Sequence, residues 1–177
     1  SEVDKLLREN EKLLEDIERT VKRMLERIKK LNDDVHREIR RIDEENRRLL
    51  DEIEKKVRDE RMVREVTERL KRTLDEIRDI ARKAAEEHDR LLEEAEKIIR
   101  DVREESDRSL EEIERKVKGR DLDRLRRVVE KSKKRIEELE REARKVAKDV
   151  KKNLEELLEE VKESVRESEK RIKETEK

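Results

Sequence analysis

The sequence predicts an all-α fold, an up-down-up antiparallel three-helix bundle of long, nearly untwisted helices. Three observations predict it: an apolar pattern with the period of an α-helix, two short breaks that divide the 177 residues into thirds, and extra apolar residues that widen each stripe. A stripe wide enough to face two neighbours is typical of a bundle and not of a two-stranded coiled coil. We expect a single domain over residues 1–177, with helices at about 2–58, 60–118 and 121–176.

The apolar pattern is clearest from Ile17 to Val57, where inward-facing residues recur at steps of four and three. Five of them occupy each 18-residue unit, and 18 divided by 5 gives the 3.6 residues per turn of an unsupercoiled α-helix. The unit continues through all three thirds, so we expect crossing angles near zero. The inward series also passes through polar residues, namely Asn10, Asn46, His88, Ser106, Ser132 and Ser168.

Two breaks interrupt the series. At the first, Asp59 is expected to accept hydrogen bonds from the free N–H groups of the second helix as its N-cap. At the second, Gly119 is expected to adopt the left-handed conformation that ends a helix, and Asp121 to cap the third. Because connections this short force sequential helices to be antiparallel neighbours, the breaks indicate the up-down-up order.

The composition excludes several classes of protein. The 53 basic and 54 acidic residues are interleaved and give a net charge of −1, which offers no field for nucleic acid or anionic lipid. There is no cysteine for a disulfide or thiol chemistry and no apolar run long enough to cross a membrane, and we expect no signal peptide. We expect a soluble protein of otherwise unknown location, cytoplasmic if it is made in a cell.

The polar residues on or beside the apolar stripe fall into predicted layers. If the chain turns near residues 60 and 120.5, facing positions sum to about 120 across the first turn and about 241 across the second. These sums bring together one residue from each helix at three heights. The predicted layers are Asn10, Ser109 and Ser132; Asn32, His88 and Asn153; and Asn46, Thr73 and Ser168, with Ser106, His36 and Ser164 close enough to extend them.

Chance scattering of buried polar groups is unfavourable, because each unpaired amide or hydroxyl costs about 1 to 3 kcal/mol. Their alignment across the turns therefore indicates hydrogen-bond networks. We expect these networks to fix which helix faces which and in what register, as a buried asparagine does in coiled coils.

Equal helices, the 18-residue repeat, a Glu/Lys/Arg surface, a core without aromatics and polar layers together resemble one family over all 177 residues. The chain is similar to de novo designed, parametrically generated straight helical bundles with modular buried hydrogen-bond networks. This resemblance implies no evolved substrate. The chain departs from a fully idealised design in one respect, since its first turn lacks glycine.

Catalytic and metal-binding roles are weak alternatives. His36 and His88 are the only histidines, and no His–His pair has ligand spacing on one helix, so no metal site is expected. Protonation of a buried neutral histidine is expected at most to destabilise its layer partly. Ser106 and His88 lie 18 residues apart, about 27 Å along a helix, too far for nucleophile and base. The protein is not expected to be an enzyme or to need a cofactor.

Two functions from different classes fit these observations. The first is a monomeric structural scaffold with no natural biochemical activity, which requires no partner. The alternative is a designed interaction module: an oligomer subunit, a helix-exchanging protein or a pH-responsive switch, acting through self-association or a designed partner chain. A natural spectrin-like linker is a distant third, because the core lacks aromatic residues.

Overall fold

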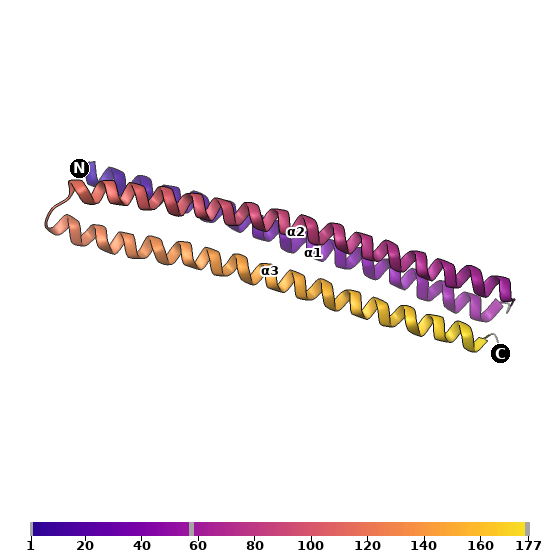
Figure 1. Ribbon diagram of the computed structural model, residues 1–177. Helices are drawn as coiled ribbons and strands as arrows, with labels where there is room; N and C mark the ends of the chain where they lie inside the picture. The colour runs from indigo at the N-terminus through magenta and orange to yellow at the C-terminus, as the bar shows by residue number, and fades with distance from the viewer. Residues whose placement is uncertain (1, 57–58, 176–177) are drawn as a thin grey trace. The chain divides into compact units, whose positions relative to one another are not determined.

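The computed structural model describes residues 2–56 and 59–175, without the side chains of Ile53, Lys56 and Thr175. Three α-helices account for nearly all of them: α1 (Glu2–Lys56, 55 residues), α2 (Glu60–Lys116, 57 residues) and α3 (Arg120–Thr175, 56 residues) (Figure 1). The part of the chain so described holds no β-strand. The all-α prediction is confirmed, and the expected helix ends at residues 58 and 176 lie outside the described residues.

The helix ends follow from their capping residues. The backbone N–H of Arg61 donates to Oδ1 of Asp59 at 3.2 Å, which is the predicted N-cap of α2. Gly119 has the predicted left-handed backbone, with φ of 71°. The predicted cap at Asp121 is wrong, because α3 already begins at Arg120 and the N–H of Leu122 bonds to the carbonyl of Gly119 at 3.0 Å. Asp121 instead lies in the first turn, where its charge faces the positive end of the helix dipole.

The chain forms two compact units, each containing a segment of all three helices. Unit 1 comprises residues 1–28 and 88–148, and unit 2 comprises residues 29–87 and 149–177. Each unit is a three-helix arrangement with its own apolar core. The single domain and the near-zero crossing angles expected from the sequence stay predictions.

The core of unit 1 joins the beginning of α1 to the end of α2 and the beginning of α3. Leu7 packs there with a cluster in which every member is at most 7% exposed. Because an early α1 residue meets late α2 residues, α1 and α2 are antiparallel, and α3 returns parallel to α1. The other members are Leu110, Ile113, Val117 and Leu125.

The core of unit 2 places small side chains of α2 against large ones of its neighbours. Ala81 and Ala84 are buried in one cluster with Val35, Ile39 and Leu157. Small side chains on α2 leave room there for larger ones on α1 and α3. A second cluster in this unit, Leu50, Val66, Leu70 and Ile172, packs near the connection between α1 and α2.

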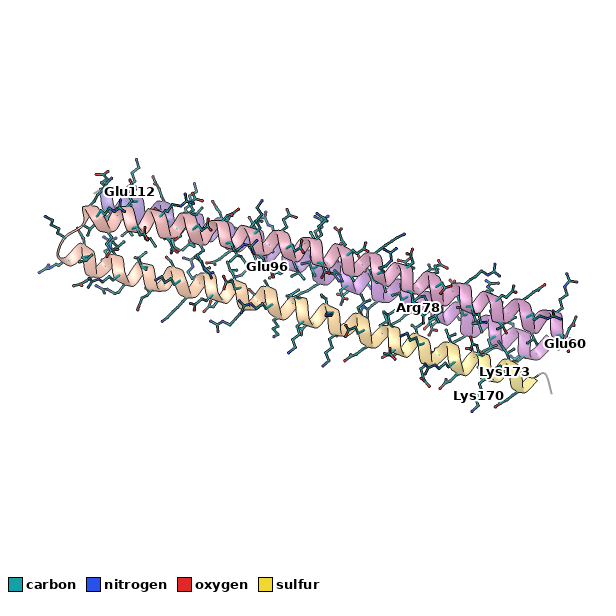
Figure 2. The ribbon with its side chains drawn as sticks, in the orientation of Figure 1. Glu60, Arg78, Glu96, Glu112, Lys170 and Lys173 are labelled. Atoms are coloured by element: carbon teal, nitrogen blue, oxygen red, sulfur yellow. The ribbon has the colours of Figure 1, made fainter. Side chains whose placement is uncertain are left out.

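The outer faces of the helices are charged. The residues labelled in Figure 2, which are Glu60, Arg78, Glu96, Glu112, Lys170 and Lys173, are all exposed. Ion pairs at helical spacing join many such residues; Arg82, for example, pairs with Asp79 at 2.6 Å and with Glu86 at 2.9 Å. Hydrogen bonds from Arg82 and Lys83 lower the pKa of Asp79. Among the helices described, none is long and apolar enough to cross a membrane.

Candidate functional site

A buried hydrogen-bonded cluster in unit 1 joins all three helices. Asn10 of α1 is 3% exposed, Ser106 of α2 is 1% exposed and Ser132 of α3 is 4% exposed. The Asn10 amide donates from Nδ2 to Oγ of Ser132 at 3.3 Å, and its Oδ1 accepts from Oγ of Ser106 at 2.9 Å. One asparagine side chain carries both a donor and an acceptor, so it can bridge two hydroxyls. We call this set the Asn10 cluster.

The residue that α2 contributes to the cluster is not the one predicted from the positions of the two turns. The sums paired Asn10 with Ser109, and Ser109 with Ser132, but the α2 hydroxyl that bonds to Asn10 belongs to Ser106. Ser109 is half-buried and lines a shallow surface hollow with acidic residues of α2. The inward series already passed through Ser106, so helical phase was the signal that favoured it over Ser109.

A second polar cluster joins α1 to α3 within unit 2. Oγ of buried Ser164 donates to Oδ1 of Asp43 at 3.0 Å and accepts from Nε of Arg47 at 3.1 Å. Arg47 also pairs with the other oxygen of Asp43 at 3.1 Å. The Asp43 side chain is 15% exposed, so the arginine and the hydroxyl replace the water that this carboxylate loses. Ser164 was predicted from sequence, whereas Asp43 and Arg47 were missed because charged residues were assigned to the solvated face.

His36 also joins α1 to α3, through backbone oxygens and not through a polar layer. Its Nδ1 lies 2.9 Å from the carbonyl oxygen of Asn32, and its Nε2 lies 3.3 Å from the carbonyl oxygen of Asn153. A neutral imidazole has one N–H and therefore donates to one of these oxygens only, while an imidazolium donates to both. The ring is half-buried beside a hollow whose charged members are Asp33, Arg37, Arg40, Glu156 and Glu160.

The predicted central layer is wrong for one of its members. Asn32 is buried, but the side chain of Asn153 is exposed, so its amide is not part of a buried network. Within the described residues, Oδ1 of Asn32 is buried without a hydrogen-bond partner. His88 is buried in unit 1, whereas Asn32 and Asn153 belong to unit 2, so its place in a shared layer stays a prediction.

The third predicted layer contains buried hydroxyls that bond within their own helices. Oγ1 of Thr73 donates to the carbonyl of Arg69 at 2.9 Å, and Oγ of Ser168 donates to the carbonyl of Ser164 at 2.9 Å. Asn46 is half-buried. A serine or threonine in a helix can satisfy its hydroxyl on the carbonyl four residues earlier, so burial of these residues requires no cross-helix partner.

Arginines of α3 form ion pairs with acidic residues of α1 in each unit. Arg135 bonds to Glu11 at 2.6 Å and also to Glu18. Partial burial disfavours the charge of Arg135, but the hydrogen bonds to Glu18 and Glu11 outweigh this and raise its pKa. Arg171 bonds to Glu54 at 2.6 Å and to Asp51 at 3.1 Å, and these bonds raise its pKa as well. Both guanidinium groups therefore stay charged.

The hydroxyls of these clusters bond to amide, carboxylate and guanidinium groups. Ser106 bonds to an amide oxygen and Ser164 to a carboxylate and a guanidinium, so neither serine meets a histidine base. Over the residues that the structure describes, no group of three or more His, Cys, Asp or Glu side chains is arranged to hold a metal ion. The polar side chains are suited to joining helices.

Comparison with solved structures shows a similar fold. A structure described as a "Computationally designed three helix bundle" superposes with a TM-score of 0.53 over 98% of this chain and 83% of that chain. The chain has the fold of a three-helix bundle. The two sequences are 19% identical, so the similarity concerns the fold alone. No family model matches the sequence, and no curated protein matches it.

Proposed function

We propose that this protein is a designed structural scaffold with no natural biochemical activity, whose helix pairing is specified by buried polar side chains. The observation that carries the proposal is the Asn10 cluster, because one buried amide joins α1, α2 and α3 by hydrogen bonds. A helix placed in another register leaves these groups buried and unpaired, at about 1 to 3 kcal/mol each. The cluster therefore favours a single helix alignment.

Three further observations support this proposal. The chain has the fold of a bundle that was itself computationally designed. Its core is built without any aromatic residue, and its apolar residues keep an 18-residue period through three helices of similar length. The interleaved charges of both signs, with a net charge of −1, favour a chain that acts alone and binds no nucleic acid.

The experiment that tests the proposal is light scattering coupled to size-exclusion chromatography at two concentrations at least fiftyfold apart. A scaffold closed on itself gives the mass of one chain, 21.7 kDa, at both concentrations. A mass that rises to a defined oligomer with concentration contradicts a self-contained scaffold and favours the alternative, a designed oligomer subunit. Unfolding in urea, followed by circular dichroism, then tests whether the monomer is cooperatively folded.

A further inference from the structure

Most of the ion pairs between helices lie where α1 faces α3, in both units, while the pair of Arg103 with Glu140 joins α2 to α3. In unit 1, Arg124 pairs with Asp4, and Arg135 pairs with Glu11 and Glu18. In unit 2, Arg171 pairs with Asp51 and Glu54. All five pairs have the acid on α1 and the arginine on α3. We call this set of residues the α1–α3 seam; a sixth and more exposed pair, Arg40 with Glu160, has the opposite order.

The seam has a constant register. The paired residues are 117 to 124 positions apart in the sequence, so α1 and α3 run parallel in each unit. Arg124, Arg135 and Arg171 follow one another at 11 and 36 residues, which are about three and ten turns of an α-helix. The three arginines therefore lie on one face of α3.

Short connections join α1 to α2 and α2 to α3, but no connection joins α1 to α3. Residues 57–59 connect α1 to α2, and residues 117–119 connect α2 to α3, so short connections set both of those alignments. No connection joins α1 directly to α3, so the height of α3 beside α1 follows only indirectly, from the two turns in succession. The side chains of the seam add orientation and register, as arginine–carboxylate pairs do at an interface between two molecules.

We propose that the α1–α3 seam is a recognition surface for an α3 helix, and that it accepts the α3 of a second copy of this chain when the charges match. The proposal rests on the scaffold function, because it says which ion pairs determine the α3 helix that completes the three-helix bundle. The chain's own α3 has the advantage of a high effective concentration, so exchange becomes visible when that helix is mismatched. In such an exchange the chain would open at the connection between α2 and α3, which contains Gly119, the glycine with positive φ.

The test uses complementary charge reversals in the full chain. The first variant reverses the seam on α3: Arg124→Glu, Arg135→Glu and Arg171→Glu. The second reverses it on α1: Asp4→Lys, Glu11→Lys, Glu18→Lys, Asp51→Lys and Glu54→Lys. A third variant combines all eight changes and restores the attraction with inverted signs. The matched control makes the same net charge change at exposed arginines on the opposite face of α3: Arg126→Glu, Arg141→Glu and Arg166→Glu.

Urea unfolding gives the first readout. One exposed ion pair changes a folding equilibrium constant about 1.5- to 5-fold, and reversal replaces attraction with repulsion in five pairs. We expect the first and second variants each to lose at least about tenfold in that constant, and the control and the combined variant to stay within about threefold of wild type. Equal losses in the control and the first variant would overturn the proposal, because net charge alone would explain them.

Co-refolding gives the second readout. When the first and second variants are refolded together in equal amounts, exchange of α3 matches both seams at once. Native mass spectrometry should then show a one-to-one heterodimer as the main species, while each variant alone stays monomeric or unfolds. A mixture without heterodimer refutes recognition of a second copy, even when the combined variant recovers stability. The scaffold function is judged separately, by the mass of the wild type alone.

Discussion

Replacement of Asn10 by leucine is the sharpest test of the buried cluster. Leucine has a similar size, so the change removes two hydrogen bonds, to Ser106 and Ser132, with little change in volume. Each bond contributes about 0.5 to 1.5 kcal/mol, which sets the total loss at about 1 to 3 kcal/mol. The abandoned hydroxyls can turn to carbonyls of their own helices, as that of Ser168 does, and leucine adds apolar burial. We therefore expect Asn10→Leu to lower the free energy of unfolding by about 1 to 2 kcal/mol.

The assay is guanidinium unfolding followed by circular dichroism at 222 nm, in which this loss shifts the midpoint by a few tenths of a molar at unchanged slope. Adding Ser106→Ala and Ser132→Ala removes the remaining buried hydroxyls, and this triple variant should match or exceed the wild type. The matched control is Ser109→Ala, expected within about 0.5 kcal/mol of wild type. If Asn10→Leu is neutral, or if Ser109→Ala costs as much as Ser106→Ala, the reasoning about this cluster is refuted.

Three further predictions concern packing, a turn and pH. Ala84→Leu overfills the core of unit 2 beside Val35 and should lower the free energy of unfolding by about 1 to 3 kcal/mol in the same titration. Gly119→Ala meets no atom within 4 Å but places a Cβ on a backbone with positive φ, so we expect a loss of about 1 kcal/mol, and a smaller one for Gly119→Asn. Because the pKa of Asp79 is lowered in the folded state, its carboxylate contributes stability above about pH 4, and this stability is lost as the pH falls through the folded-state pKa. Asp79→Asn should therefore reduce the difference between the urea midpoints measured at pH 7 and at pH 3.

The fold could be predicted because the spacing of apolar residues and the residues that end helices can both be read directly from the sequence. A spacing of 3.6 fixes which face of each helix is apolar, and the breaks at Asp59 and Gly119 fix where the helices turn. Ala84 is buried in one cluster with Val35 and Leu157, where a small side chain on α2 leaves room for larger ones on α1 and α3.

The polar contacts were harder to predict, because turn arithmetic gives the height of a residue but not its direction around the helix. Ser106 and Ser109 differ by less than one turn in height, yet only Ser106 points to Asn10. The side chain of Asn153 faces solvent, although its carbonyl oxygen lies 3.3 Å from Nε2 of His36 on α1. Asp43 and Arg47 could not be separated by composition from the many other charged residues, since their contacts depend on the position of Ser164 on another helix.

The 18-residue period also creates a set of competing alignments. A helix that slides along its neighbours by 18 residues, about 27 Å, presents almost the same apolar stripe again. The shifted state loses hydrophobic stabilisation only in proportion to the helix overlap that it gives up. Apolar contacts alone therefore discriminate poorly between the native and the shifted alignment. The Asn10 cluster and the bonds of Ser164 to Asp43 and Arg47 are unlike each other and occur once each. A shift by one 18-residue repeat therefore preserves much of the apolar packing but breaks both sets of polar contacts.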